Sequence, residues 1–131
     1  MLRILAAVAV VVVLSGAAIA GSLELLTNDE LETLSAGIAA EQSGDDAMAE
    51  RLLRPIAEGG NRESQLLLGI IYDNFDGRGQ GVTQDFAEAM KWYRLAAEQG
   101  LAAALYNLGR IYAFGRGVPQ DYVDAVKWYR L

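Results

Sequence analysis

Carboxylates are the residues best suited to chemistry in this sequence of 131 residues, because it contains no histidine and no cysteine. Without these two residue types the chain can form no Ser-His or Cys-His dyad, no histidine or thiolate zinc site and no disulfide. A hydrolase that uses paired carboxylates would need two acids facing one cleft with perturbed pKa values. The acids fall mainly at expected helix caps and on polar helix faces, so a hydrolase of this kind is disfavoured. We predict no catalytic residue and no cofactor.

The run Asp73–Gly81, rich in glycine, invites two functional interpretations. A phosphate-binding loop is disfavoured, because a helix rather than a strand is expected before the run and no Lys-Ser/Thr pair follows it. A calcium loop is disfavoured because the first glycine stands fifth from Asp73 rather than sixth, and position twelve is Gln84. A turn between helices, with glycines at positive φ, explains the run better. We therefore predict no metal site.

The charge of the chain limits the class of partner. The chain carries 11 lysine and arginine residues against 17 acidic residues, a formal net charge of −6. Nucleic-acid binding needs a clustered basic surface. We predict no nucleic-acid partner, and a protein that works through its shape and surface.

The N-terminal segment has the three parts of a secretory signal peptide. Met1–Arg3 gives a positively charged start, Ile4–Leu14 is unbroken apolar sequence, and Ala18–Ala20 is a small-residue cleavage site. We predict cleavage after residue 20 and export to the bacterial periplasm or the medium. The alternative is an uncleaved inner-membrane anchor, although the apolar segment is at the lower length limit for a span. Membrane association is expected only in that case.

Self-comparison shows an internal repeat. Val82–Leu95 recurs as Val118–Leu131 at an offset of 36 residues, and Leu68–Tyr72 matches Leu108–Tyr112 at an offset of 40. The four extra residues must lie between the two matched segments, in the glycine-rich stretch. Insertions of this kind fall in loops, so the repeat is a pair of helices joined by a loop of variable length.

An earlier, decayed copy precedes these two. Its matches at an offset of 40 are Asp45, Ala47, Ala49, Arg54, Ala57, Glu58 and Gly60. Pro55 is expected to kink or end the second helix of this copy. Before it, Thr27 and Glu30 have capping-box spacing and predict a helix that runs to about Gln42.

Two features of the repeated helices indicate how they pack. Trp92, Trp128, Tyr93 and Tyr129 recur at helical spacing, which makes them core residues rather than a recognition stripe. Gly69 and Gly109 recur inside the first helices, where glycine is unfavourable, and so indicate a close crossing of the backbone. Asp85 is expected to cap its helix, with Glu88 at capping-box spacing.

A pattern of many positions is formed by Leu108–Tyr122, Ala125 and Lys127–Arg130, with the ending Ala96–Gly100 in the preceding copy. This pattern resembles the Sel1-like repeat, a relative of the tetratricopeptide repeat, and extends weakly back to residue 29. The resemblance implies an all-α fold, in which helix-turn-helix units stack into a right-handed α-superhelix (an α-solenoid). It also implies a concave side lined by the first helices, an adaptor role in protein assembly, and no catalytic residues.

We predict four segments: a signal peptide (1–20), an N-terminal helix with a degenerate repeat (21–60), a full repeat (61–100) and a repeat truncated at its C-terminus (101–131). The last copy stops where the preceding one continues with Ala96–Gly100. Repeat arrays usually need about three units and polar end caps. We therefore favour a truncated reading frame or a marginal fold over an end that docks onto another surface.

The first helices carry the candidate partner-binding residues, which are Glu63, Leu66, Ile70, Tyr106, Asn107 and Arg110. One interpretation is that Leu66, Leu67 and Ile70 pack beneath the N-terminal helix. The other is a groove, apolar in one repeat and polar in the next, that binds an extended or helical peptide of a partner protein. The leading prediction is thus an exported, non-enzymatic protein-interaction module. A membrane-tethered scaffold or regulator and a carboxylate-based envelope hydrolase are the alternatives.

Overall fold

The computed structural model describes residues 26–131, and this part of the chain is built from helices joined by turns. The predicted signal segment, residues 1–20, lies outside the described residues. The helices are α3 (Asn28–Gln42), α4 (Asp46–Glu58), α5 (Arg62–Asp73), α6 (Phe86–Glu98), α7 (Ala102–Phe114) and α8 (Tyr122–Arg130). The predicted all-α fold is confirmed.

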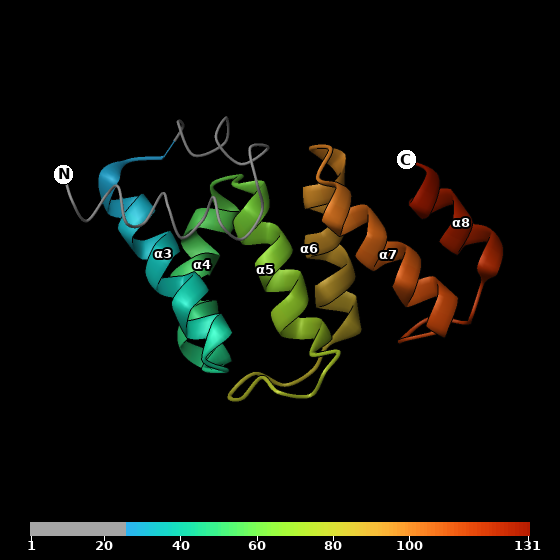
Figure 1. Ribbon diagram of the computed structural model, residues 1–131, viewed down its shortest axis with the longest axis horizontal. Helices are drawn as coiled ribbons and strands as arrows, with labels where there is room; N and C mark the ends of the chain where they lie inside the picture. Colours follow the sequence, from blue (N-terminus) through green and yellow to red (C-terminus); the bar gives the residue numbers. More distant parts are fainter. Residues whose placement is uncertain (1–25) are drawn as a thin grey trace.

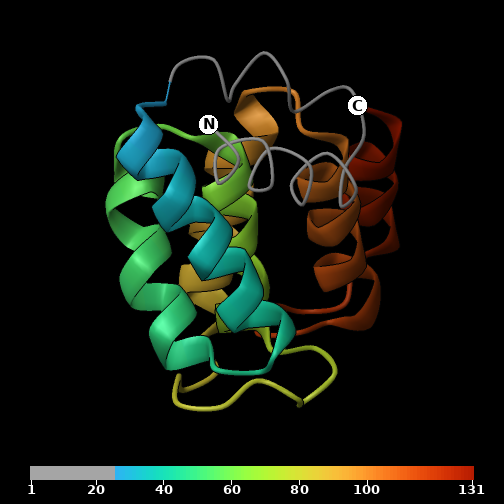
Figure 2. The ribbon, with the colours of Figure 1, turned by 60° about the vertical axis from the view of Figure 1, so that its left-hand side comes forward.

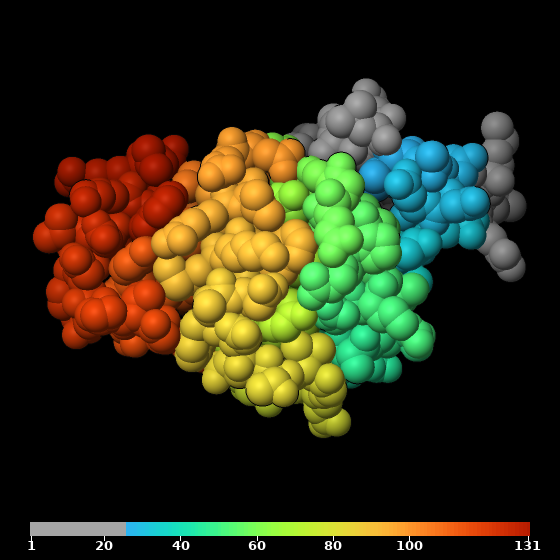
Figure 3. Space-filling model, turned by 180° about the vertical axis from the view of Figure 1, so that it is seen from behind, coloured from blue at the N-terminus to red at the C-terminus, as the bar shows by residue number. Residues whose placement is uncertain are grey.

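Each helix packs against the next one along the chain, so the molecule is a row of helical hairpins. Figure 1 shows α3, α5 and α7 on one side of the molecule. Figure 3, seen from behind, shows the opposite side, to which α6 and α8 contribute. Helix α3 also contacts α5, so the first helices of these two hairpins are neighbours. This arrangement is the predicted helical-repeat solenoid.

Side chains at the helix starts account for most helix boundaries. Thr27 and Glu30 form the predicted capping box at α3, in which the Thr27 N–H donates to Glu30 Oε2 at 2.8 Å. Asp85 caps α6 by accepting from the Glu88 N–H at 3.1 Å. The expected reciprocal bond of Glu88 is absent there, because its carboxylate accepts a hydrogen bond from the Trp92 indole at 3.2 Å instead. An aspartate also caps α4 and α8.

The prediction that Pro55 ends its helix early is wrong. Helix α4 continues through Pro55 to Glu58. The proline removes one N–H, which would otherwise donate to the carbonyl of Arg51, and the helix tolerates this single lost bond one turn before its end. Gly60 and Gly100, which lie just after α4 and α6, have φ angles of +102° and +81°, a conformation that favours glycine.

The core lies between the two sides of the row and is divided among the hairpins. One cluster joins α3, α4 and α5 and includes Trp92 of α6; a second joins α6 and α7 around Tyr93. Trp92 and Tyr93 are buried, as predicted, and Trp128 is half-buried. Tyr129 is 46% exposed, which corrects its assignment to the core. Among the described helices, α8 packs closely only against α7, and several of its side chains are exposed, including Tyr122, Val123 and Val126.

At the two mid-helix glycines that recur in the sequence, the next helix packs closely, as predicted. A methyl group placed on Gly69 would lie 2.4 Å from the Tyr93 ring, and one on Gly109 would lie 2.4 Å from the Tyr129 ring. The aromatic residue of the second helix therefore occupies the space that any other side chain on the first helix would need. This contact sets the distance between the two helices of each hairpin.

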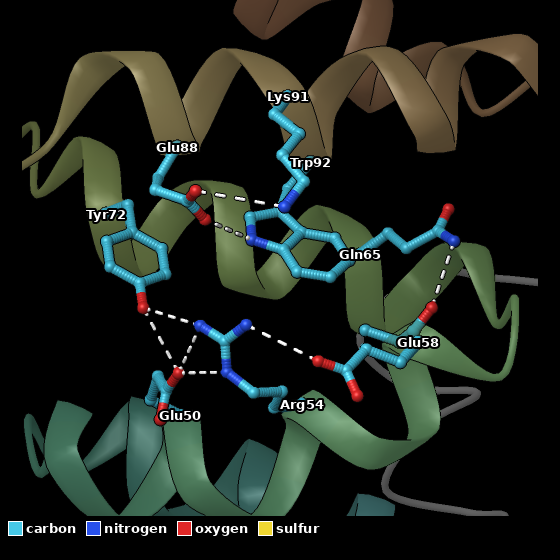
Figure 4. Close-up of polar contacts among 9 residues, drawn as sticks. Glu50, Arg54, Glu58, Gln65, Tyr72, Glu88, Lys91 and Trp92 are labelled. Atoms are coloured by element: carbon cyan, nitrogen blue, oxygen red, sulfur yellow. Dashed lines mark hydrogen bonds and ion pairs between the residues drawn. The ribbon is translucent and has the colours of Figure 1, made fainter.

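Polar contacts at the tyrosine that follows each of these glycines join one repeat to the next. Arg54 donates to the Tyr72 hydroxyl at 2.7 Å, and Arg94 donates to the Tyr112 hydroxyl at 3.1 Å. In each pair the two residues are 18 positions apart. Figure 4 shows the first pair, in which Glu50 also accepts from the Tyr72 hydroxyl at 3.1 Å. The repeat in the sequence is therefore also a repeat in polar contacts.

We expect the substitution Gly69→Ala to lower the free energy of unfolding by about 1–2 kcal/mol. Overpacking against the buried Tyr93 ring costs about 1–3 kcal/mol, which exceeds the roughly 1 kcal/mol that alanine gains over glycine in a helix. Gly109→Ala is the matched control, because the half-exposed Tyr129 ring can move aside. Urea denaturation should show a clear loss for the first variant and a small change for the second. Equal effects would contradict this account of the glycines.

Candidate functional site

A cavity of about 600 Å³ opens between α3, α5 and α7. It is lined by the C-terminal ends of α3 and α5, by one side of α7 and by the glycine-rich loop that follows α5. Figure 2 looks toward α3, with α5 behind it and the loop below the helices. The cavity therefore lies among the first helices of three successive hairpins, and its floor is the loop whose length varies between repeats.

Asp73, the last residue of α5, is the polar centre of this cavity. Its side chain is 1% exposed, and Oδ2 accepts hydrogen bonds from the Tyr93 hydroxyl at 3.1 Å and from Arg110 Nη2 at 2.8 Å. Arg116 Nη2 lies 3.9 Å from Oδ1. One carboxylate thus links α5, α6, α7 and the loop after α7, and removing it would leave a buried guanidinium without its counter-ion.

The aromatic ring of Phe75 holds the loop against these cations. The Arg110 guanidinium lies 3.8 Å from the ring centroid, and that of Arg116 lies 4.6 Å from it. Stacking of this kind favours guanidinium groups, which are planar and weakly hydrated. The chain reaches Phe75 through Asn74, which has a φ angle of +41°, and leaves through Gly77 at +68°. The prediction of an inter-helix turn with positive φ at glycine is confirmed.

Two groups of titratable residues in the cavity have shifted pKa values. Burial raises the pKa of the Tyr93 hydroxyl, and the charge of Asp73 raises it further, so the hydroxyl stays a donor. On the α3–α4 side, burial raises the pKa of Glu41 and of Asp46. Repulsion from Asp46 and Asp76 adds to the shift of Glu41, and repulsion from Asp76 and Asp45 adds to that of Asp46. The cavity therefore has a neutralised side at Asp73 and Arg110, and an acidic side at Glu41 and Asp46.

Half of the predicted partner-binding residues meet at this cavity. Ile70, Asn107 and Arg110 line it. Ile70 also packs against the core cluster between α6 and α7, as does Leu66, which is not among the lining residues. Leu67, by contrast, packs against the cluster that contains the buried side of α3. Packing beneath the N-terminal helix therefore describes Leu67, whereas Ile70 lines the cavity.

The remaining candidates lie away from the cavity. Glu63 is buried at the start of α5, where its carboxylate accepts from Arg62 Nε at 3.0 Å. Tyr106 is 59% exposed on α7, and its ring lies 5.8 Å from that of Tyr129. Only Tyr106 of this set offers a large exposed surface. The binding role of all six residues stays a prediction.

Comparison with known proteins assigns the chain to a family. The model of the Sel1 repeat matches residues 62–101 and 102–131, which together make up more than half of the chain. The chain belongs to the Sel1 repeat family. Among solved structures it is similar to a Sel1 repeat protein from Oxalobacter formigenes, with 31% identity and a TM-score of 0.63 over 77% of this chain. The match spans 41% of that protein's length. None of the curated proteins searched matched the chain.

The central carboxylate of the cavity was missed by sequence reasoning, although a signal for it exists. At the offset of 40, Asp73 of one Sel1 repeat corresponds to Ala113 of the next, and Ile70 corresponds to Arg110. An acid thus replaces an apolar residue in one repeat, and a base replaces an apolar residue in the other. The structure brings these two departures together as an ion pair between the Sel1 repeats. Comparing the positions where the repeats differ, rather than where they agree, would have found it.

The residues that the structure describes include no group of three or more histidine, cysteine or acidic side chains that could hold a metal ion. Asp73, considered above as the first position of a calcium loop, is instead paired with Arg110.

A double-mutant cycle tests the ion pair between the Sel1 repeats. Asp73→Ala is expected to lower the free energy of unfolding by about 3–5 kcal/mol, because it leaves Arg110 buried without a counter-ion. In the double variant with Arg110→Ile, each position carries the residue of the other repeat, and its loss should be smaller than the sum of the single losses by about 1–3 kcal/mol. Asp76→Ala, which changes an exposed pair, is the control and should cost about 0.5 kcal/mol or less. Additive losses in urea denaturation would contradict the coupling.

Proposed function

We propose that this chain is an exported, non-enzymatic interaction module that binds a peptide segment of a partner protein on the side formed by α3, α5 and α7. The observation that carries the proposal is the cavity on that side, which no single hairpin could form and which three first helices line together. Sel1 repeat proteins are typically protein-protein interaction modules, which supports the same class of function. The partner is identified only as a protein or peptide.

The binding surface combines the features that peptide recognition needs. The cavity offers buried polar groups, such as Asn107, beside apolar side chains, such as Ile70. Tyr106 adds an exposed aromatic side chain on the same helix as Asn107. Aromatic residues with rigid surroundings bind partners at low cost in conformational entropy, and convergent polar groups give specificity. In this structure the exposed aromatic side chain and the polar group both lie on α7, a regular helix.

A carboxylate hydrolase is the second candidate, and one observation favours it. Glu41 and Asp46 line the same cavity with raised pKa values, which is one property of a catalytic acid pair. We expected the acids to lie mainly at caps and on polar faces, and these two line a cavity instead. Turnover of an envelope polymer that is lost in both Glu41→Gln and Asp46→Asn would favour the hydrolase over the interaction module.

Export and location belong to the proposal as well. The charged start, apolar centre and Ala18–Ala20 site favour a cleaved signal peptide and a periplasmic or secreted protein. A membrane-tethered scaffold is the alternative if the segment is retained. Within residues 26–131, no helix is both long enough and apolar enough to span a bilayer.

Site-specific photocrosslinking in cells tests the binding side. A photoreactive phenylalanine analogue at Tyr106, which is exposed on α7, should give a discrete adduct with a partner. The same analogue at Leu95, exposed on α6, is the matched control and should not give that adduct. Identical adducts from both positions, or none from position 106, would argue against the proposed side.

The intact mass of the protein purified from the envelope tests export. We expect the mass of the full chain minus residues 1–20, because the segment has a cleavage site and no charged stop-transfer sequence after it. Retention of the whole segment, together with fractionation to the membrane, would support the tethered alternative and contradict cleavage.

A further inference from the structure

The charged groups that line the cavity do not balance. Four are carboxylates, from Glu41, Asp46, Asp73 and Asp76, and two are guanidinium groups, from Arg78 and Arg110. Both guanidinium groups are already engaged: Arg110 with Asp73 and Arg78 with Asp76. Two carboxylates, those of Glu41 and Asp46, are left over.

The carboxylates of Glu41 and Asp46 make no hydrogen bond and no ion pair with residues 26–131. Asp46 lies near other acids, and the Glu41 carboxylate, which is repelled by Asp46 and Asp76, is attracted only at longer range by Arg78. Asp46 is only 5% exposed, and the loop closes tightly over it: a methyl group on Gly79 would lie 1.7 Å from Asp46 Oδ2. A buried charge without a partner is costly, because desolvation is not offset by hydrogen bonds. Such a residue is expected where function requires it.

Asp46 does not make the capping bond of α4, although an acid in the first turn of a helix is favoured by the helix dipole. It is the first residue of α4, and the capping bond to that helix is made by its neighbour Asp45, which accepts from the Met48 N–H at 3.1 Å. Burial raises the pKa of Asp46, and repulsion from Asp76 and Asp45 raises it further. A positive charge in the cavity would relieve both the burial cost and the repulsion.

The chemistry of the cavity distinguishes between kinds of cation. A metal ion needs several oxygen ligands around one point, and the described residues form no group of three or more acids that could hold one. The volume of about 600 Å³ also exceeds what a bare ion would occupy. Besides the acids, the lining includes Ile70, Ile71 and Phe75. Apolar and aromatic surface of this kind suits the methylene stem of a long basic side chain.

We propose that the cavity receives a lysine or arginine side chain of the partner peptide, with its cationic group between Glu41 and Asp46 and its stem against Ile70 and Phe75. This inference rests on the proposed function, since it names what the binding side selects. The pair Asp73–Arg110 then has a positioning role: it neutralises the far side of the cavity, so that the net negative charge lies at the α3–α4 side.

Selection from a displayed library of random-sequence peptides tests this proposal on the full chain as purified from the envelope. The wild-type protein should select peptides with lysine or arginine enriched at one position relative to the unselected library. The double variant Glu41→Gln/Asp46→Asn should lose that enrichment. The control variant, Asp29→Asn/Glu32→Gln, removes the same two charges from exposed positions on α3 and should keep it.

Binding of a single selected peptide gives the quantitative test. Replacing its enriched lysine or arginine by norleucine should weaken binding to the wild type and to the control variant at least about tenfold, and should change binding to the double variant little. Peptides selected without basic enrichment, or enrichment that survives in the double variant, would overturn the proposal while leaving peptide binding intact. Selection of no peptide above background by the wild type would instead overturn the proposed function.

A stability measurement keeps the test independent of the library. Asp46→Asn removes a buried charge without a partner and retains the shape of the side chain, so its thermal midpoint at neutral pH should be higher than that of the wild type. Glu41→Gln, on a side chain that is less buried, should show a smaller rise. A lower midpoint for Asp46→Asn would mean that the carboxylate is already compensated within the fold, which would contradict the basis of the proposal.

Discussion

Tyr93 makes the contact on which the packing of the described helices depends. Tyr93 lies on α6, and its ring fills the space left by Gly69 on α5. Its hydroxyl donates to Asp73, the last residue of α5. Asp73 in turn accepts from Arg110 of the following repeat. The side chain of one tyrosine therefore sets the spacing within a hairpin and, through a single carboxylate, links that hairpin to the next.

The cavity follows from this linkage. Asp73 is held by Tyr93 and Arg110, the chain turns directly after it through Asn74 at positive φ, and the Phe75 ring stacks against Arg110. The loop returns along α4, where Gln80 forms backbone bonds with the segment around Asp45. The variable loop of the repeat is thus the floor of a cavity whose walls are the less variable helices.

Repetition in the sequence predicted the architecture well, because helix periodicity, aspartate caps and mid-helix glycines are local signals with one physical meaning each. It predicted the site only in part. Ile70, Asn107 and Arg110 were found, since they lie on the expected side of the first helices. Asp73 was not, because an acid in a glycine-rich run suggests a ligand loop until its long-range partner is known. Glu41 and Asp46 belong to different helices, and no spacing along the chain indicates that they share a cavity.

Native-state hydrogen exchange of the full chain tests most directly whether the Tyr93–Asp73–Arg110 linkage unites the repeats. If it does, the slowest amides of α5, α6 and α7 should exchange through one shared opening with a common free energy. Those of α8, which among the described helices packs closely against α7 alone, should open at a lower free energy. The Asp73→Ala substitution should then lower the protection of α5, α6 and α7 together. A separate opening for α7, unaffected by that substitution, would contradict the account.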